Sequence, residues 1–444
     1  MPIQKSNIGS LQYMKCCFTA AVALLLGTAA MAQPKNLRLW AQEELLQSKE
    51  LRSAHIGISI YDPATKKYWF QHQDDKFFVP ASNTKIFTLF AGLQLLGDSL
   101  PGMRFTENDT ALYVQGTADP SFLHPDFISQ PVLDKLSATG KNIWLQPAVI
   151  KNKRFGPGWG WSDYADYYQP ELNEWPMYGN VARIRMKGAS YSMTPEFETE
   201  LIYERPPAEP LADREERENL FTLHIRSDIH AEQLYEVPFI TGSTTQLARR
   251  LQDTLRRPVR VMGTPAVMQG AVLHSIPVDT LFQPMMHRSD NFFAEQILMM
   301  ASALKYDAID SRKVIGYLLD SLLQDLPHPP NWVDGSGLSR YNLFTPRDFV
   351  SVLDKMYKAH PKERLFPLFP SGGKGTMKNY YQSLPNRFYA KTGTLSGVVA
   401  LSGYIVTKSG KTLIFSVLVN NHNTTATNVR RAVERFLVRT ANAG

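Results

Sequence analysis

A serine is followed three residues later by a lysine at Ser82-Asn83-Thr84-Lys85. Residues 86–96 show helical periodicity and Gly97 follows as a stop, so Ser82 is predicted to lie at a helix N-terminus. The unpaired N–H groups of that helix end would favour a developing negative charge. Lys85 lies one turn further on the same face, and in its neutral form it would be a general base for a serine nucleophile. The alternative is a serine N-cap followed by an exposed lysine.

A second polar group, Ser289-Asp290-Asn291, interrupts a helical pattern that runs from Val278 to Leu304. Ser289 and Asn291 would therefore project from a loop between two helices, where a hydroxyl and an amide can exchange hydrogen bonds with a substrate. Ser, Asp and Asn are also the preferred N-cap residues, so a purely structural role stays open.

A third group, Lys391-Thr392-Gly393, falls on a predicted strand that precedes a hairpin partner. Lys391 would bind a substrate carboxylate, and Thr392 would hydrogen-bond to it. Gly393 would let a ligand backbone approach closely. An exposed edge strand that carries a lysine is the alternative. Each of the three groups is a weak signal alone, but their order and their contexts (helix start, inter-helix loop, strand) fit one serine hydrolase site.

The elements that must hold these groups lie at the two ends of the chain. Alternating patterns predict strands at 55–61, from 68 onward, and at 388–394, 398–407 and 412–420. They are expected to form one antiparallel sheet of five strands, with helices from both ends of the chain (36–48 and 429–437) covering one face. Between 101 and 267 prolines, aromatics and short alternating runs indicate inserted β-rich material in one or two lobes.

The composition is that of a globular protein. The chain has 444 residues, of which 43% are hydrophobic and 20% charged, which favours two or three domains and argues against a disordered chain. A dense arginine cluster is interpreted as a solvated helix face, since nucleic acid is no expected partner of an exported chain; it comprises Arg249, Arg250, Arg256, Arg257 and Arg260.

Residues 1–32 have the pattern of a cleaved export signal. Lys5 and Lys15 precede or border a short apolar run, and Ala30-Met31-Ala32 is a small-x-small cleavage site. The apolar run is too short for a stable membrane span, so secretion to the periplasm is expected; a retained anchor is the alternative. Both cysteines, Cys16 and Cys17, lie in this segment, so the mature chain would have no disulfide, thiol chemistry or cysteine-bound metal. Its net charge would be +5, which suits an anionic polymer such as cell wall.

With these motifs, the chain resembles the penicillin-binding and serine β-lactamase superfamily. It is most similar to the D-alanyl-D-alanine carboxypeptidase/endopeptidase family, the low-molecular-mass class C penicillin-binding proteins of peptidase family S13. Four stretches carry the resemblance beyond the short motifs: residues 287–295, 334–342, 374–377 and 390–395. The resemblance implies an α+β transpeptidase-like catalytic domain formed by residues 33–100 and 268–444, with residues 101–267 inserted. Residues 116–120 depart from a more glycine-rich turn of the family.

The resemblance also implies roles. Ser82 would be the acylated nucleophile, Lys85 its base, and Ser289 the relay that passes a proton to the leaving amine. Asn291 would hold the substrate amide, while Lys391, Thr392 and Gly393 would bind the end of the substrate that carries the carboxylate. The oxyanion hole would be formed by the backbone N–H groups of Ser82 and Thr394. The expected partners are peptidoglycan peptides and β-lactam inhibitors, with no cofactor and no metal.

Two features of the insert and two rival functions complete the expectations. Residues 169–174 look like the deacylating loop of class A β-lactamases, but they precede Ser289 and carry Gln169 at the glutamate position. The aromatic run between Trp159 and Tyr168 would either stack on glycan sugars or form the small core of a lobe. The rival functions are a β-lactamase or esterase of the same fold and a catalytically inactive cell-wall binding protein.

Overall fold

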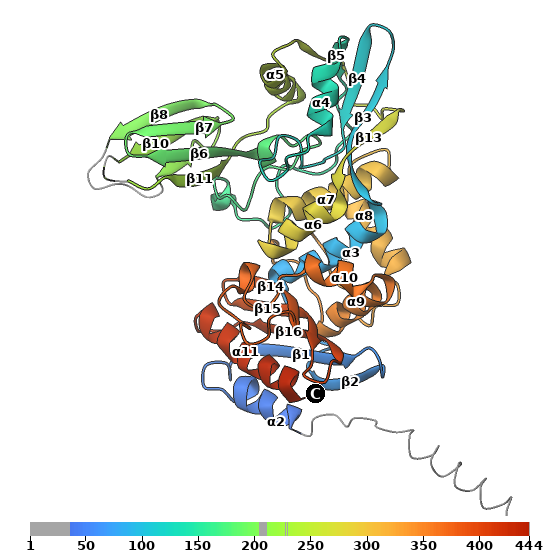
Figure 1. The fold of residues 1–444 in the computed structure, drawn as a ribbon, viewed down its shortest axis with the longest axis vertical. Coiled ribbons are helices and arrows are strands. Elements are labelled where there is room, and N and C mark those ends of the chain that lie inside the picture. Colours follow the sequence, from blue (N-terminus) through green and yellow to red (C-terminus); the bar gives the residue numbers. More distant parts are fainter. Residues whose placement is uncertain (1–35, 204–210, 227, 229, 444) are drawn as a thin grey trace, which may run out of the picture.

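The computed structural model describes residues 36–203, 211–226, 228 and 230–443. The predicted export signal, residues 1–32, lies outside these described residues. Figure 1 shows a long molecule with a helix-covered sheet at one end and two groups of strands at the other. Within the described residues, no helix combines the length and the apolar composition needed to cross a membrane.

The first body is a five-stranded antiparallel sheet in the order β14-β15-β16-β1-β2. Its strands are β1 (His55–Asp62), β2 (Lys67–His72), β14 (Phe388–Leu395), β15 (Val398–Val406) and β16 (Thr412–Asn420). The two ends of the chain meet where β1 pairs with β16, His55 opposite Asn420. All residues of β16 are buried because helices cover both faces of the sheet. The antiparallel sheet predicted from the alternating patterns is confirmed, and its two edge strands are β14 and β2.

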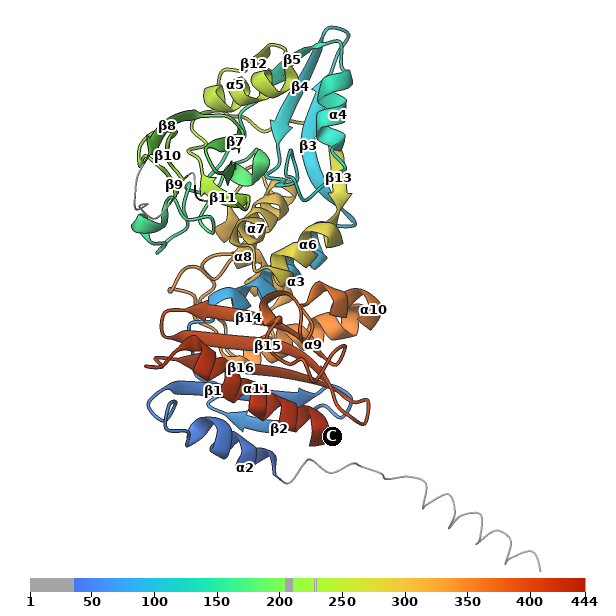
Figure 2. The same cartoon turned by 60° about the vertical axis from the view of Figure 1, so that its left-hand side comes forward.

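One face of this sheet is covered by segments from both ends of the chain, as predicted (Figure 2). They are α2 (Leu37–Ala41), the π-helical turn η1 (Gln42–Leu46) and the C-terminal helix α11 (Ala426–Ala443). The apolar stripe of α11 packs on the sheet, for example Phe436 within the cluster that contains Phe415.

The opposite face carries a larger helical layer. Its elements are the 3₁₀ turn η2 (Ala81–Thr84), α3 (Lys85–Leu95), α6 (Val278–His287), α7 (Asn291–Lys305), α8 (Ser311–Tyr317), the π-helical turn η5 (Leu318–Leu322), α9 (Pro346–Ala359), α10 (Lys362–Leu365), and the 3₁₀ turns η6 (Phe366–Leu368) and η7 (Gly375–Met377). Residues 292–303 of α7 are all buried, so this helix runs through the core. The helices α3 and α7 both begin at one of the predicted motifs.

The insert contains a mixed five-stranded sheet in the order β12-β5-β4-β3-β13. Its strands are β3 (Ser99–Glu107), β4 (Ala111–Gly116), β5 (Asn142–Leu145), β12 (Val259–Val261) and β13 (Ala271–Pro277), with α4 (Pro131–Ala138) and α5 (Thr244–Leu255) packed against them. Because this sheet extends from Ser99 to Pro277, it crosses both predicted limits, 101 and 267. The division into domains at those limits stays a prediction.

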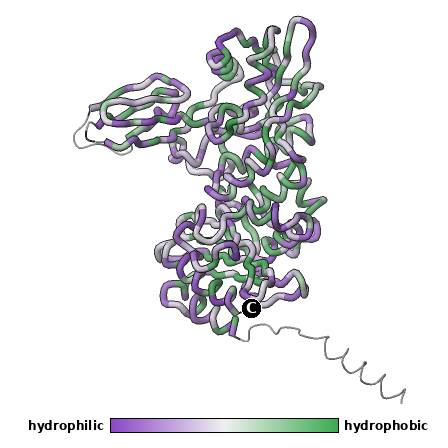
Figure 3. Tube along the Cα trace, viewed as in Figure 1, coloured by the Kyte–Doolittle hydropathy of each residue, from purple (hydrophilic) through white to green (hydrophobic). Residues whose placement is uncertain are grey.

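Two three-stranded sheets form the other group of strands, which projects to the left in Figure 1. They contain β6 (Val181–Lys187), β7 (Ser190–Thr194) and β11 (Gln233–Pro238), and β8 (Glu198–Tyr203), β9 (Ala212–Arg214) and β10 (Leu220–Ile225). Short 3₁₀ turns, η3 (Trp161–Asp163) and η4 (Tyr178–Asn180), lie on the connecting segment. Figure 3 shows that apolar residues are concentrated along the central helices, whereas apolar and polar residues alternate along the projecting strands.

The insert departs from the sequence prediction in its helices. The β-rich prediction missed α4, and only the arginine cluster indicated α5, although Ser243 and Gln246 form a capping box that marks the start of α5. The prediction of one solvated helix face is wrong for three members of the arginine cluster: Arg257 follows α5, Arg260 lies on β12, and Arg250 and Arg257 bind backbone carbonyls. Arg250 is largely buried and donates to the Thr241 carbonyl, and Arg257 donates to the Lys141 carbonyl at 2.5 Å. These two side chains therefore tie α5 and the segment after it to neighbouring backbone.

Candidate active site

Ser82 lies on the 3₁₀ turn η2, directly before α3. Ala81, the residue before it, has φ 48°, a left-handed conformation that costs a non-glycine residue about 1–3 kcal/mol. The turn packs so closely on β14 that residue 393 has no room for a side chain. A Cβ on Gly393 would lie 2.6 Å from the Pro80 carbonyl oxygen and 3.1 Å from the Ser82 nitrogen. Gly393 was predicted to admit a ligand backbone; here its missing side chain admits the turn that carries Ser82.

Asn83 secures the same turn to two strands. In the amide orientation that satisfies both its atoms, Asn83 donates to the Lys391 carbonyl at 2.6 Å and accepts from the Ser402 N–H at 3.2 Å. The nucleophile's turn is therefore bound to β14 and β15 by a fully buried amide.

Lys85 is fully buried, and its side-chain nitrogen has three close neighbours. Nζ lies 3.1 Å from Ser82 Oγ, 2.6 Å from Asn291 Oδ1 and 2.7 Å from the Ser336 carbonyl oxygen. A neutral amine has two N–H donors and one lone pair. If the two shorter contacts take the donors, the lone pair faces the Ser82 hydroxyl, which is the arrangement a general base requires.

The charge of Lys85 is disfavoured by its surroundings. Burial lowers the pKa of Lys85 to about 8, although the nearby carboxylates of Asp290, Glu295 and Asp334 act in the opposite direction. Burial, followed by the charge of Asp334, raises the pKa of Glu295 to about 7. A substantial fraction of Lys85 is thus neutral near pH 8.

The loop of residues 334–342 holds Lys85 from the other side. Glu295 accepts hydrogen bonds from the N–H groups of Gly335 and Ser336 at 3.0 and 2.7 Å, which fixes the carbonyl that Lys85 contacts. Gly337 has φ 81°, and a Cβ there would lie 1.9 Å from the Ala81 carbonyl oxygen. The glycine therefore lets this loop contact the nucleophile's turn directly.

Ser289 and Lys391 form a second pair. Lys391 Nζ donates to Ser289 Oγ at 2.8 Å and to the Thr392 carbonyl at 2.7 Å. Lys391 is fully buried, and burial together with the charge of Lys85 holds its pKa well below the usual range. Ser289 itself has φ 65°, so its backbone also lies in the left-handed region. The two lysines thus each contact one motif serine.

Asn291 joins the nucleophile to the insert. Its Oδ1 accepts from Lys85, and its Nδ2 donates to the Tyr168 carbonyl at 3.0 Å. An amide oxygen has a second lone pair and the nitrogen a second proton, so capacity for a substrate amide remains. The predicted substrate contact of Asn291 stays a prediction.

The alternation of side chains along β14 separates the remaining motif residues. Lys391 and Gly393 face η2 and the Ser289 loop, whereas the Thr392 hydroxyl donates to Thr376 Oγ1 at 2.8 Å beside α11. The Ala390 N–H donates to the Pro370 carbonyl at the free edge of β14, so the N–H groups of Thr392 and Thr394 leave by the same edge. That direction suits the predicted oxyanion donor Thr394.

These groups open into a cleft of about 610 Å³. Its walls include Ser82, Ser289, Asn291 and Thr394 on the catalytic side, and its lining on the side of the insert is formed by His124, Asp126, Tyr167, Tyr168, Arg183 and Glu236. The aromatic residues between Trp159 and Tyr168 do not form one cluster. Trp159 donates to Asp334 at 2.9 Å, whereas Trp161 and Tyr167 are exposed, so a lobe core does not account for these two.

Three contributors were missed by the motif reasoning: the Tyr168 and Ser336 carbonyls and the Glu295 carboxylate. The carbonyls belong to the backbone and leave no side-chain signal. Glu295 lies one turn after Asn291 on α7, and that spacing on a buried helix was a usable signal.

Comparison with known proteins agrees with this geometry. The sequence matches the family model described as D-Ala-D-Ala carboxypeptidase 3 (S13) over residues 41–191 and 247–440. A D-alanyl-D-alanine carboxypeptidase of Actinomadura sp. (strain R39) is 25% identical over an alignment of length 473, which covers 90% of this chain and 85% of that protein. The D-alanyl-D-alanine carboxypeptidase DacB of Haemophilus influenzae is 33% identical over 159 residues, 34% of this chain and 33% of that protein.

The fold is similar to that of solved structures. The crystal structure of penicillin binding protein 4 from Haemophilus influenzae superposes with a TM-score of 0.70 at 20% identity, covering 91% of this chain and 99% of that one. The predicted α+β penicillin-binding fold is confirmed by this likeness.

Proposed function

The chain belongs to the D-Ala-D-Ala carboxypeptidase 3 (S13) family, and on that premise we propose that it cleaves D-alanyl-D-alanine-type bonds of peptidoglycan peptides through an ester on Ser82. The observation that carries the proposal is the set of contacts of Lys85. A buried lysine with a lowered pKa lies 3.1 Å from a serine hydroxyl, and two acceptors occupy its other directions.

In the first step the Ser82 hydroxyl attacks the carbonyl carbon of the penultimate D-alanine, and Lys85 takes the hydroxyl proton. The negative charge that forms on the carbonyl oxygen faces the N–H groups of Ser82 and Thr394. Each such donor contributes about 3 kcal/mol to stabilising the transition state. The direction of the Thr394 N–H at the free edge of β14 supports this assignment.

In the second step the C–N bond breaks and the leaving amine needs a proton. Ser289 gives its hydroxyl proton to that amine, and the proton that Lys85 took from Ser82 replaces it, so Lys85 is neutral again when water attacks. Lys391, which contacts Ser289 Oγ at 2.8 Å, holds this hydroxyl in place. The products are free D-alanine, or the released peptide of a crosslink, and an ester on Ser82. Water then hydrolyses the ester and restores the serine.

Lys391 is further proposed to attract the terminal carboxylate of the substrate. Burial and the charge of Lys85 lower the pKa of Lys391, and a carboxylate that enters beside Lys391 would favour its charged form and pair with it. The Thr392 hydroxyl faces Thr376 on the other side of β14, so only the backbone of Thr392, together with Gly393, remains a proposed contributor at this end of the cleft.

Replacing Lys391 by alanine is expected to slow acylation by substrates that carry the carboxylate about 100-fold, because a buried charge loses its partner. An uncharged activated ester should be slowed far less. Stopped-flow acylation rates on both substrates test this. Equal losses on both would assign Lys391 to Ser289 or Lys85 instead of to the carboxylate.

The proposed setting is the periplasm, reached by cleavage of the export signal after Ala32, and β-lactams are the proposed inhibitors. The test of the function uses the mature chain, its N-terminus first read by mass spectrometry and expected at Gln33. Digestion of purified peptidoglycan should then release D-alanine, shortened stem peptides or uncrosslinked peptides, identified by mass. Intact muropeptides after prolonged digestion would contradict the proposed function.

A further inference from the structure

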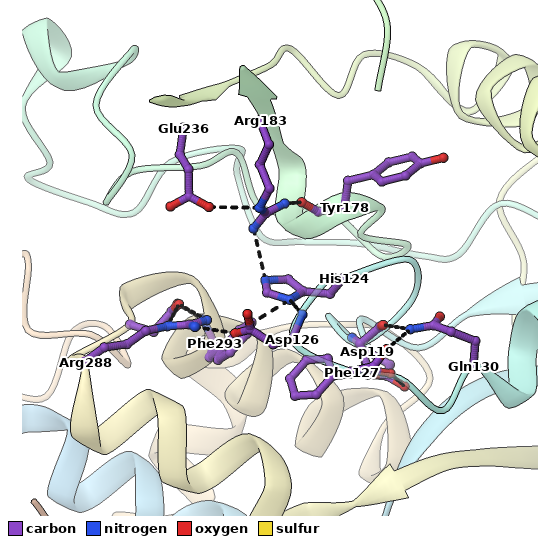
Figure 4. A network of polar contacts seen from close by, with 12 residues as sticks. Asp119, His124, Asp126, Phe127, Gln130, Tyr178, Arg183, Glu236, Arg288 and Phe293 are labelled. Carbon is purple, nitrogen blue, oxygen red and sulfur yellow. Dashed lines mark hydrogen bonds and ion pairs between the residues drawn. The ribbon is translucent and has the colours of Figure 1, made fainter. Parts of the chain in front are cut away.

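A row of charged side chains runs from the insert to the Ser289 loop (Figure 4). It begins with Glu236 on β11, which pairs with Arg183 on β6 at 2.9 Å. Arg183 Nη2 lies 3.4 Å from His124 Nε2, and the loop of His124 also carries Asp126. Asp126 binds Arg288, the residue before Ser289. The row thus joins two strands of the projecting lobe to the turn that holds the proposed relay serine.

The middle of the row is held in one arrangement. His124 Nδ1 accepts a hydrogen bond from the Asp126 N–H at 3.2 Å, and its Nε2 lies 3.4 Å from Arg183 Nη2, so the ring links Arg183 to the backbone of Asp126. The ring is buried beside Phe127 and Phe293, with centroids 5.2 and 5.1 Å away. Arg183 is fixed in turn by the Tyr178 carbonyl, to which its Nη1 donates at 2.6 Å.

The end of the row controls the backbone around Ser289. Arg288 bridges Asp126 and Asp290, with its Nη2 3.0 Å from Asp290 Oδ2. Asp290 Oδ1 also caps α7 by accepting from the Phe293 N–H at 2.9 Å. Ser289 lies between these two anchored residues at φ 65°, a conformation that persists only when the surroundings impose it.

We propose that Asp126 and Arg288 are positioning residues for Ser289. Through them the insert sets Ser289 Oγ at its 2.8 Å contact with Lys391 and toward the leaving amine. This inference rests on the proposed function, because it assigns Ser289 the relay role. The side chains of Arg288 and Asp126 are 44% and 35% exposed, so their ion pair contributes little to global stability. Its loss should therefore appear in catalysis.

The test replaces Asp126 by alanine and uses Asp279→Ala as the matched control. Asp279 lies at the start of α6, the helix that ends just before Arg288, and forms an ion pair with Arg364. The side chains of Asp279 and Arg364 are 39% and 35% exposed, similar to those of Asp126 and Arg288. Asp126→Ala should slow acylation by an amide or a penicillin between about 10-fold and 100-fold, the scale expected for a misplaced catalytic group. Asp279→Ala should acylate at the wild-type rate.

The leaving group separates positioning from general structural damage. A thioester that matches the amide in its acyl group and carboxylate loses a thiolate, which needs no proton from Ser289. Asp126→Ala should therefore spare the thioester and slow the amide. In a double-mutant cycle, Asp126→Ala should add nothing further to Arg288→Met.

Three results would overturn the proposal: a wild-type amide rate in Asp126→Ala, equal slowing of amide and thioester, or additive effects in the cycle. Hydrogen exchange of residues 287–293 gives a readout independent of activity, and faster exchange is expected in Asp126→Ala but not in Asp279→Ala. If wild-type protein is not acylated at all, the proposed function fails. In that case the hydrogen exchange of residues 287–293 still tests the positioning role, and an unchanged rate in Asp126→Ala would reject it.

Discussion

Replacing Ser82 by alanine is expected to abolish acylation by a penicillin and release of D-alanine, a loss of roughly 10⁶-fold. The reason is geometric, because Ser82 Oγ is the hydroxyl that Lys85 Nζ approaches at 3.1 Å, on a turn held by Gly393 and Asn83. The fold should survive. The lost hydrogen bond contributes about 1 kcal/mol, and Lys85 keeps its contacts to Asn291 and Ser336.

The measurement is mass spectrometry after incubation with a penicillin. A penicillin resembles the dipeptide and contains a strained amide, so wild-type protein should gain one drug mass on the peptide that contains residues 82–85. Ser82→Ala should gain none, with nearly unchanged thermal unfolding as the control. An adduct on a different serine, or full D-alanine release by the variant, would remove Ser82 from the nucleophile's role.

Local patterns were sufficient to predict where the motifs lie. The helical period after Ser82, the interruption at Ser289 and the alternation around Lys391 all depend on residues close in sequence, and the structure has a helix start, an inter-helix loop and a strand at these places. The five strands of the catalytic sheet were predictable for the same reason. Their pairing required the further assumption that the two ends of the chain meet.

Contacts between distant segments were beyond such patterns. Nothing near Asn291 in sequence indicates that its amide binds the Tyr168 carbonyl, 123 residues away. The same is true of Lys85 and the Ser336 carbonyl, which are 251 residues apart. Because backbone carbonyls occur at every residue, their participation depends on tertiary placement alone.

The third motif shows a different limit. The sequence motif assigns Lys391 and Thr392 together to one carboxylate, yet neighbouring side chains of a strand point to opposite faces. The Thr392 hydroxyl accordingly faces Thr376 beside α11, while Lys391 reaches Ser289. The period of two residues along a strand, applied to the motif itself, is enough to place these two side chains on different faces.

Replacing Lys85 by methionine is expected to slow acylation between about 10²-fold and 10⁴-fold, the usual contribution of a general base. Methionine is close to lysine in length and apolar, so it suits a fully buried position better than arginine, which stays charged. Lys85→Arg is the companion variant, and it should lose acylation as well because a guanidinium cannot accept the Ser82 proton.

The pH dependence distinguishes a base from a mere contact. The pKa of Lys85 is about 8, so the neutral base grows as pH rises and amounts to about a tenth of the molecules at pH 7. Wild-type acylation should therefore rise nearly tenfold per pH unit below about 8 and level off above it. Lys85→Met should show no such rise, with circular dichroism confirming that it is folded. A flat wild-type profile from about pH 6 to 10, or near-normal labelling of Lys85→Met, would show that another group takes the proton.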